Sequence, residues 1–346
     1  MIYPDFLHTK DTIGFIAPSF GCSFNPYHAC LNQTIKRFKE MGYNTWVGPN
    51  CYLSEGIGIS NKPSECAAEL MDAYTSGKCD FLMAVAGGEL MCEILEYIDF
   101  NSLRKVKPKW YMGFSDNTNF GFLSTTILNV ASIYSPNACV FAMNKWHPAV
   151  NDLYDLITGK KLSFVGYSGW EKESLKSESN PYASYNITQQ SIIKVYSDNS
   201  IGNFKPVSFT GRLTGGCLDC LANLVGTKYD RVEEYATRYA DSGIVWFLEA
   251  CDLNVMDIRR ALWQLDNAGW FKHSKGFIIG RPYNFNQPMM GLDQYSAVTG
   301  ILGKYNVPII MDADIGHIAP SIPLINGSIA TIKVQDRNYS ITMELK

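Results

Sequence analysis

The sequence predicts an α/β fold: a mainly parallel sheet flanked by helices, followed by a C-terminal α/β region that ends in short strands. Two observations predict it. Short apolar runs alternate with segments whose apolar residues recur at helical spacing, as at 12–17 and then 31–41. After residue 206 this rhythm resumes and ends in strand-like runs at 328–334 and 339–345. Alternating strands and helices are typical of parallel sheets covered by helices on both faces.

The N-terminal elements follow this rhythm closely. The helix expected at 66–74 has clear end signals, because Pro63 precedes it and Gly77 follows it. The run at 80–86 is apolar enough for a buried strand. In chain order we expect strands at 12–17, 44–47, 80–86 and 110–114, and helices at 31–41, 66–74, 89–98 and 117–128.

The remaining chain divides into a polar middle and a patterned end. The stretch from 151 to about 200 is rich in Ser, Asn, Lys and Tyr with weak periodicity, which indicates a long crossover that carries a loop. We therefore expect three parts: 1–150, a crossover and loop at 151–205, and 206–346. In the last part we expect strands at 207–213, 243–248, 276–280 and 307–311, and helices at 218–225 and 255–270.

Composition narrows the class of protein. The 346 residues are 46% apolar and 18% charged, with a net charge of −3. This balance argues against nucleic acid or an anionic membrane as the main partner. No run of about 18 apolar residues predicts a membrane helix, and the first residues lack the basic and apolar regions of a signal peptide. We expect a cytoplasmic protein whose ten cysteines are mostly buried thiols.

Ser115 is the first candidate for chemistry. It follows an expected strand and precedes an expected helix, in the order Gly113-Phe114-Ser115-Asp116-Asn117. A sharp strand-to-helix turn exposes a serine hydroxyl, and the N–H of Asp116 then faces the same space as an oxyanion donor. The alternative is a helix N-cap, a common place for serine. The pattern also has Asn117 where the last glycine of G-x-S-x-G stands.

A nucleophilic serine needs a base and an orienting carboxylate. Of the five histidines, His317 lies in a loop just beyond an expected strand, between Gly316 and Pro320, and leads by elimination. Glu249 ends a run of five apolar residues, where a carboxylate is costly to bury without a partner. The alternative is that Glu249 only marks the point where the strand reaches water, and Asp252 is a second candidate for its role.

Two glycine or cysteine motifs leave both readings open. Gly87-Gly88 follows a buried strand, so it suits either close ligand approach to exposed N–H groups or only a tight turn. Cys217 and Cys220 form a C-x-x-C on an expected helix. A redox or zinc function for this pair needs a thioredoxin-like context or two further ligands, and neither is evident in the sequence.

Taken together, these stretches resemble the LD-carboxypeptidase and microcin C immunity family of serine peptidases. The resemblance spans nearly the whole chain, and its motifs occur in family order. They are Ile16-Ala17-Pro18-Ser19, Gly87-Gly88, Gly113-Phe114-Ser115-Asp116-Asn117-Thr118, Gly211-Arg212-Leu213-Thr214-Gly215-Gly216, Phe247-Leu248-Glu249 and Gly316-His317-Ile318-Ala319-Pro320.

The resemblance implies a Ser-Glu-His triad. Ser115 is then the nucleophile, His317 the general base and Glu249 its orienting partner, while the N–H groups of Gly88 and Asp116 form the oxyanion hole. The family places the serine on an N-terminal α/β domain and the other two residues on a C-terminal domain, and is commonly dimeric. No metal and no organic cofactor is implied.

The sequence also departs from the family pattern. Cys217 stands where the family usually has Asn after the paired glycines. The text after Gly87-Gly88 and the long middle segment resemble the microcin immunity branch, in which an aromatic residue of the middle loop stacks on a nucleotide-like ligand. Trp170 is the candidate for this role, and packing is the alternative.

Three functions follow as expectations. The first is a serine carboxypeptidase or amidase of LD-carboxypeptidase type, which cuts an amide near the C-terminal end of a muropeptide. The second is a self-immunity hydrolase that acts on a peptidyl-nucleotide. The third, from another class, is a catalytically silent binding protein, against which the intact Ser115, Glu249 and His317 argue. Partners beyond a small peptide-like substrate are expected to be limited to a second copy of the chain, with neither nucleic acid nor membrane.

Overall fold

The computed structural model describes residues 1–346 and divides into two compact units. Unit 1 comprises Met1–Lys161 and Glu173–Asn186, and unit 2 comprises Leu162–Lys172 and Ile187–Lys346. The chain therefore crosses between the units three times, and the middle segment contributes to both. The three-part division at 150 and 205 remains a prediction.

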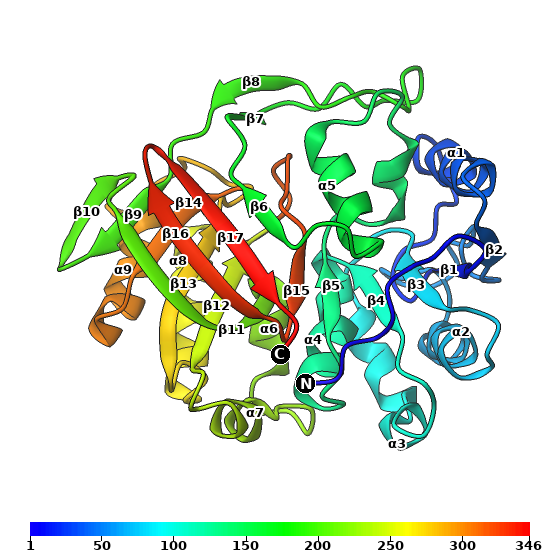
Figure 1. Ribbon diagram of the computed structural model, residues 1–346, viewed down its shortest axis with the longest axis horizontal. Coiled ribbons are helices and arrows are strands. Elements are labelled where there is room, and N and C mark those ends of the chain that lie inside the picture. The colour runs from blue at the N-terminus through cyan, green and yellow to red at the C-terminus, as the bar shows by residue number, and fades with distance from the viewer. The chain divides into compact units, whose positions relative to one another are not determined.

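Unit 1 contains a five-stranded parallel arrangement in the order β5-β4-β3-β1-β2 (Figure 1). Strands β1, β3 and β4 are almost entirely buried, as their continuous apolar runs predict, and β5, which was not expected from the sequence, is buried as well. Its strands are β1 (Thr12–Ile16), β2 (Asn44–Val47), β3 (Phe81–Ala84), β4 (Trp110–Gly113) and β5 (Ser132–Tyr134).

Helices and helical turns connect these strands. The expected helix at 66–74 is confirmed as α2, which has Pro63 at its first position. The helices of unit 1 are α1 (Tyr27–Glu40), α2 (Pro63–Thr75), α3 (Phe100–Leu103), α4 (Thr118–Thr126) and α5 (Pro148–Ile157), with 3-10 turns η1 (Met91–Tyr97), η2 (Ser115–Asn117) and η3 (Ala138–Ala142).

One expected helix of unit 1 is wrong in type. The segment at 89–98 forms the 3-10 helix η1 rather than an α-helix. Its buried residues Met91, Ile94 and Leu95 are three and four positions apart, a spacing that both helix types place on one face over so short a length. Apolar periodicity therefore could not separate the two.

Unit 2 is built on a nine-stranded mixed sheet, in the order β10-β9-β14-β13-β12-β11-β16-β17-β6 (Figure 1). The four central strands β11 to β14 are parallel, and antiparallel strands flank them on both sides. The sheet strands are β6 (Ser163–Val165), β9 (Lys194–Ser197), β10 (Ser200–Asn203), β11 (Val207–Cys217), β12 (Ile244–Glu249), β13 (Ser274–Gly280), β14 (Ile309–Ala313), β16 (Ile329–Gln335) and β17 (Asn338–Glu344).

The other elements of unit 2 include two helices expected from the sequence. The expectation at 218–225 is confirmed as α6, and that at 255–270 as the somewhat shorter α8. The remaining elements are α6 (Leu218–Leu224), α7 (Val232–Arg238), α8 (Val255–Asn267), α9 (Gln294–Leu302), η4 (Gly303–Tyr305), the strand pair β7 (Gly169–Glu171) and β8 (Ile187–Gln190), and β15 (Leu324–Asn326).

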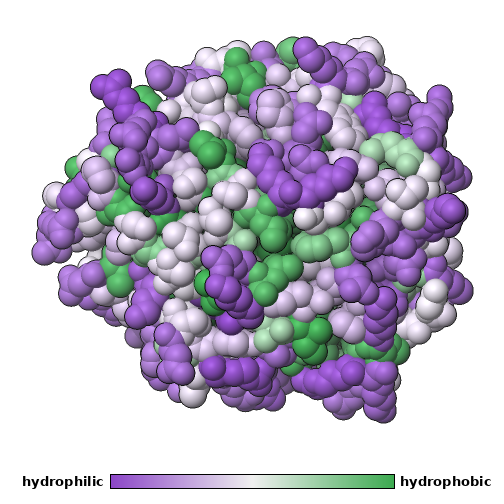
Figure 2. Space-filling model, in the orientation of Figure 1, coloured by the Kyte–Doolittle hydropathy of each residue, from purple (hydrophilic) through white to green (hydrophobic).

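The helices include no candidate for a membrane-spanning segment. None of the helices is both long and apolar enough to cross a membrane. On the face drawn in Figure 2, hydrophilic and hydrophobic residues are interspersed.

Candidate active site

Ser115 occupies a strained turn in unit 1. The buried strand β4 ends at Gly113, Phe114 is extended, and Ser115 then has a φ of 61° as the first residue of the turn η2, which leads into helix α4. A side chain other than glycine or asparagine rarely adopts this left-handed conformation, and it persists only where its surroundings enforce it. The hydroxyl is partly exposed at the carboxyl end of β4. This is the arrangement that the sequence predicts for a nucleophile.

Asn117 shows what enforces the turn. Its side-chain N–H₂ donates to the carbonyl of Ala86 at 2.8 Å and to Asn137 Oδ1 at 3.2 Å, while its Oδ1 accepts from the hydroxyl of Tyr111 at 2.6 Å. Asn137 Oδ1 also accepts from the N–H of Phe114. The residue that replaces the last glycine of G-x-S-x-G therefore ties the serine turn to the loop after β3.

Asp116 anchors the same turn through its carboxyl group. Oδ2 accepts from the hydroxyl of Ser19 at 2.5 Å and from the N–H of Met91 at 2.9 Å, and Oδ1 accepts from the side chain of Asn119 at 2.9 Å. Burial raises the pKa of Asp116 to about 6, although these hydrogen bonds oppose the shift. The carboxyl group of Asp116 therefore connects the family motif that contains Ser19 with the motif that contains Ser115.

The paired glycines lie against Ser115. A Cβ on Gly87 would stand 3.1 Å from both Cβ and Oγ of Ser115, and one on Gly88 would stand 2.1 Å from Ser19 Oγ. A side chain at Gly88 would collide with Ser19, and one at Gly87 would require Ser115 to shift by a few tenths of an ångström. The carbonyl of Gly87 accepts from the N–H of Phe20 at 2.7 Å. Because C=O and N–H point in opposite directions across a trans peptide, the Gly88 N–H points away from Phe20.

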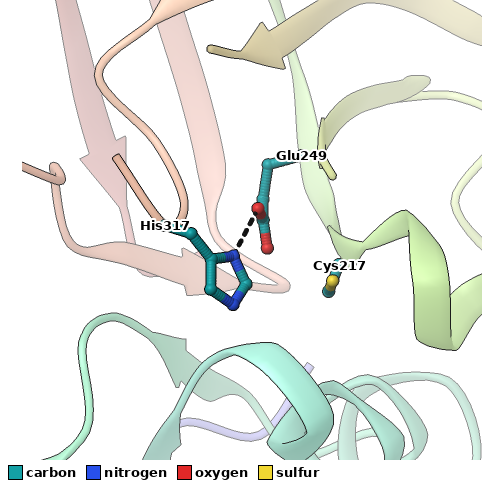
Figure 3. A group of neighbouring side chains, drawn as sticks. All are labelled: Cys217, Glu249 and His317. Carbon is teal, nitrogen blue, oxygen red and sulfur yellow. Dashed lines mark hydrogen bonds and ion pairs between the residues drawn. The ribbon is translucent and has the colours of Figure 1, made fainter. Parts of the chain in front are cut away.

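Glu249 and His317 are brought together within unit 2. Glu249 is the last residue of β12 and its side chain is fully buried, while His317 lies in the loop after β14. Nδ1 of His317 is 2.8 Å from Oε2 of Glu249 (Figure 3). Burial disfavours the imidazolium, but the charge of Glu249 and hydrogen bonds with Cys251 and Glu249 raise the pKa of His317 well above its usual range.

The glycine before His317 has a steric reason. Gly316 has a φ of 102°, and a Cβ there would lie 2.5 Å from Oε2 of Glu249. Only glycine allows the loop to pass so close to the carboxylate. Asp252, the other candidate for the orienting role, is exposed, and its N–H donates to Asp219 Oδ1 at 2.9 Å. Glu249 is the one that contacts the histidine.

Cys217 lies beside this pair. It ends the parallel strand β11, where it is the register partner of Glu249 in β12. Its thiol is 3.3 Å from Asp219 Oδ2, which also accepts from the N–H of Cys251. The neighbouring Cys220 thiol and burial raise the pKa of Cys217 well above its usual range.

Trp170 belongs to β7 of unit 2 rather than to an irregular loop. Its ring packs edge-on against Phe285 at 5.3 Å between ring centroids, and the guanidinium of Arg281 lies 4.8 Å from the ring centroid. Arg281 is itself buried and pairs with Asp314. Trp170 is 8% exposed.

Sequence reasoning missed the residues that hold the candidate groups in place. Ser19, Asn117 and Asn137 contribute no reactive group, and their partners are remote in the sequence. The family motif Pro18-Ser19 is the signal that could have identified Ser19. This motif is remote from Ser115 in the sequence, and its contact with Asp116 in the fold explains its place among the family motifs.

The candidate side chains are divided between the two units. Unit 1 holds a strained serine with glycine amides beside it, and unit 2 holds a buried carboxylate–histidine pair. Serine, histidine and a carboxylate are the side chains that serine hydrolases use.

Comparison with known families places the chain within that class. Residues 13–135 match the LD-carboxypeptidase N-terminal domain, and residues 210–332 match the LD-carboxypeptidase C-terminal domain. The chain belongs to this family of S66 peptidases.

Two relatives resemble the chain over almost its whole length. A predicted carboxypeptidase of Vibrio cholerae is 26% identical, and the match covers 97% of this chain and 98% of the relative. The microcin C7 self-immunity protein MccF of Escherichia coli is 22% identical, with 97% and 94% covered.

Solved structures share the fold. An MccF-like protein from Bacillus anthracis has a TM-score of 0.83 at 21% identity, with both chains fully covered. An MccF-like protein from Streptococcus pneumoniae, solved in complex with AMP, has a TM-score of 0.77 at 21% identity, with 97% of this chain and 99% of that chain covered.

Proposed function

We propose that this chain is a cytoplasmic serine peptidase or amidase that hydrolyses an amide near the C-terminal end of a small peptide-like substrate. The observation that carries the proposal is the Ser115 turn, in which a left-handed serine directly follows a buried strand and faces Gly87. Such backbone strain lowers stability and is found mostly at functional sites. Family membership supports the same reaction class.

In this proposal each residue has one role. Ser115 Oγ attacks the substrate carbonyl, and His317 takes the hydroxyl proton and passes it to the leaving amine. Glu249 holds the imidazole through Nδ1, so that Nε2 is the basic nitrogen. The N–H groups of Gly88 and Asp116 stabilise the oxyanion, and water then releases the acyl group from Ser115.

The test is Ser115→Ala, with Ser177→Ala in an exposed loop of unit 1 as the matched control. A murein tetrapeptide and a peptidyl-adenylate analogue are incubated with each protein, and cleavage is followed by mass spectrometry. We expect Ser115→Ala to lose several powers of ten in rate while its thermal unfolding stays cooperative. Activity above about a tenth of the wild-type value would refute the nucleophile, since loss of a triad member typically costs far more.

For the substrate, we propose LD-carboxypeptidase action on a muropeptide, with cleavage between an L- and a D-centre. The family descriptions of both halves of the chain favour it. If neither substrate is cleaved by the wild type but either one binds, the chain is the silent binding protein instead.

A peptidyl-nucleotide is the second candidate substrate. It is favoured by the similarity to MccF and by the AMP found in a structure of the same fold. In this reading Trp170 contacts the nucleobase. Trp170→Ala should then weaken AMP binding by roughly 1–3 kcal/mol, the scale of base–aromatic stacking, without changing muropeptide cleavage.

Because Trp170 also packs on Phe285 and Arg281, its loss can perturb unit 2 as a whole. Trp170→Phe, which keeps an aromatic ring, and Trp263→Ala, which removes an exposed tryptophan, serve as controls. Equal losses for AMP and muropeptide in Trp170→Ala would assign the residue to packing and remove it from the site.

We also propose that the protein is a homodimer, as the family resemblance implies. Sedimentation at micromolar concentration tests this directly, and a monomer at all concentrations would refute it.

A further inference from the structure

The thiol of Cys217 faces the pair formed by Glu249 and His317 (Figure 3). One ligand atom from each of the three residues lies within 4.8 Å of the other two. The parallel register of β11 and β12 fixes this proximity, because it places Cys217 directly beside Glu249. The C-x-x-C motif lacked two further ligands in the sequence, and the fold brings a carboxylate and an imidazole to its first cysteine.

Thiolate, imidazole and carboxylate are the donors that zinc prefers. Bonds of about 2.0–2.3 Å in a tetrahedral site require donor atoms roughly 3.3–3.8 Å apart. Because the three donor atoms lie within 4.8 Å of one another, metal binding requires these side chains to shift by about 1 Å. A second thiol is close, since Cys251 forms a side-chain hydrogen bond with His317.

We propose that Cys217, Glu249 and His317 form a binding site for one zinc ion, or another divalent cation that favours thiolate ligands. The site has three protein ligands and leaves the fourth position to water or Cys251. On binding, the Cys217 thiol releases its proton to solvent and becomes a thiolate ligand. No ligand from unit 1 is required, so the site is complete within unit 2.

Zinc at this site removes the general base. If the metal takes the lone pair of Nε2, that nitrogen can no longer accept a proton. If it binds Nδ1, the proton there moves to Nε2, and Nε2 again has no free lone pair. Both outcomes predict reversible inhibition. The binding itself is independent of the proposed hydrolysis, and only the inhibition rests on that function.

The first experiment measures binding without any substrate. Metal-free protein is titrated with zinc in competition with a chromophoric chelator. We expect one zinc ion per chain in the wild type, and at least about tenfold weaker binding in Cys217→Ser, because loss of a supporting group alone costs 10–100-fold. Cys92→Ser, which changes a thiol of unit 1, should bind zinc like the wild type. Circular dichroism checks the folding of each variant, and Cys217→Asn replaces Cys217→Ser if that protein does not fold.

Cobalt substitution identifies the ligand. Cobalt(II) bound by a thiolate gives a near-ultraviolet charge-transfer band, which we expect in the wild type and, weaker or absent, in Cys217→Ser, where only Cys251 can supply a thiolate. The thiols of Cys22 and Cys139, 3.6 Å apart in unit 1, are the competing site. A band that survives Cys217→Ser and disappears in Cys22→Ser would overturn the proposal, as would the absence of zinc binding in the wild type.

The second experiment measures inhibition on whichever substrate the wild type cleaves. Zinc should lower the rate, EDTA should restore it, and the ratio of rates with and without zinc should be smaller in Cys217→Ser than in the wild type. If the protein cleaves neither substrate, the hydrolase proposal fails while the zinc titration still decides the metal site. Equal inhibition of both proteins would show that zinc acts elsewhere.

Discussion

The imidazole of His317 is surrounded by groups that stabilise its protonated form. Glu249 Oε2 is 2.8 Å from Nδ1, and the Cys251 side chain is also hydrogen-bonded to the ring. Burial opposes the positive charge, but these contacts prevail and raise the pKa of His317. In the proposed reaction, His317 must be unprotonated to accept the proton of Ser115. The raised pKa means that the neutral form of His317 grows only at a pH well above 6.5.

We predict that His317 titrates well above the usual value of 6.5, whereas His147 titrates below it because burial lowers the pKa of that residue. The measurement is a pH series of imidazole C–H resonances, assigned with His317→Gln and His147→Gln. Glu249→Gln should bring the pKa of His317 down toward 6.5, because it removes the neighbouring negative charge. Titration of His317 below His147 would contradict the ion pair.

At this scale the sequence was informative about reactive groups and silent about their supports. Glu249 and His317 were chosen because each follows an apolar strand run, and the structure brings these two together. The hydrogen bond between Ser19 and Asp116 joins residues 97 positions apart. No local pattern encodes such a contact, so it could be found only in the folded chain.

Strands β11 and β12 approach each other closely at Gly215. A Cβ there would stand 1.7 Å from the backbone carbonyl oxygen of Phe247, two residues before Glu249. A backbone atom cannot rotate away as a flexible side chain can. The two strands would have to separate, and the position of Glu249 depends on them.

We predict that Gly215→Ala destabilises the protein by about 3 kcal/mol or more, at or beyond the upper end of the usual cost of overpacking. Gly202→Ala is the matched control, because its Cβ would lie 3.6 Å from the nearest atom, in ordinary contact. It should change stability by less than about 0.5 kcal/mol, as surface substitutions usually do. Urea unfolding of both variants gives the comparison, and equal stabilities would refute the close approach.

Buried apolar elements were predictable from the sequence, and exposed ones were not. The buried strands β3, β4 and β12 and the helix α2 each show a continuous run or a clear period with end signals. Strands β8 and β10 have four residues each, mostly exposed. Strands this exposed have no apolar run to detect, and the sequence alone does not show which segment each one pairs with. For this reason the sequence predicts a crossover and loop at 151–205.

A buried carboxyl group in unit 1 makes the free energy of unfolding depend on pH. Glu69 of α2 accepts hydrogen bonds at 2.6 Å from the N–H groups of Ala17 and Asn50. Burial nevertheless raises the pKa of Glu69 from 4.5 to about 7. Between these two values the unfolded chain is ionised while the native chain keeps its proton. The free energy of unfolding therefore falls as the pH rises through this window, and is highest, as far as Glu69 is concerned, below pH 4.5.

We predict that the free energy of unfolding of the wild type falls by roughly 3 kcal/mol relative to Glu69→Gln between pH 4 and pH 8, at about 1.4 kcal/mol per pH unit of displacement. The comparison uses urea unfolding at several pH values, so any constant cost of the substitution cancels. Glu65→Gln, an exposed position on the same helix, should follow the wild type. A pH-independent difference between wild type and Glu69→Gln would contradict the assignment.

The three crossings between the units have a consequence for how such a gene can be recombined. Residues 173–186 belong to unit 1, where Asn144 donates to the carbonyl of Tyr182, while residues 162–172 belong to unit 2, where β6 pairs with β17. A single breakpoint between the two halves therefore cannot exchange either unit intact. Any chimera that exchanges one unit has to transplant two separate segments together, and this holds both for the unit with Ser115 and for the unit with Glu249 and His317.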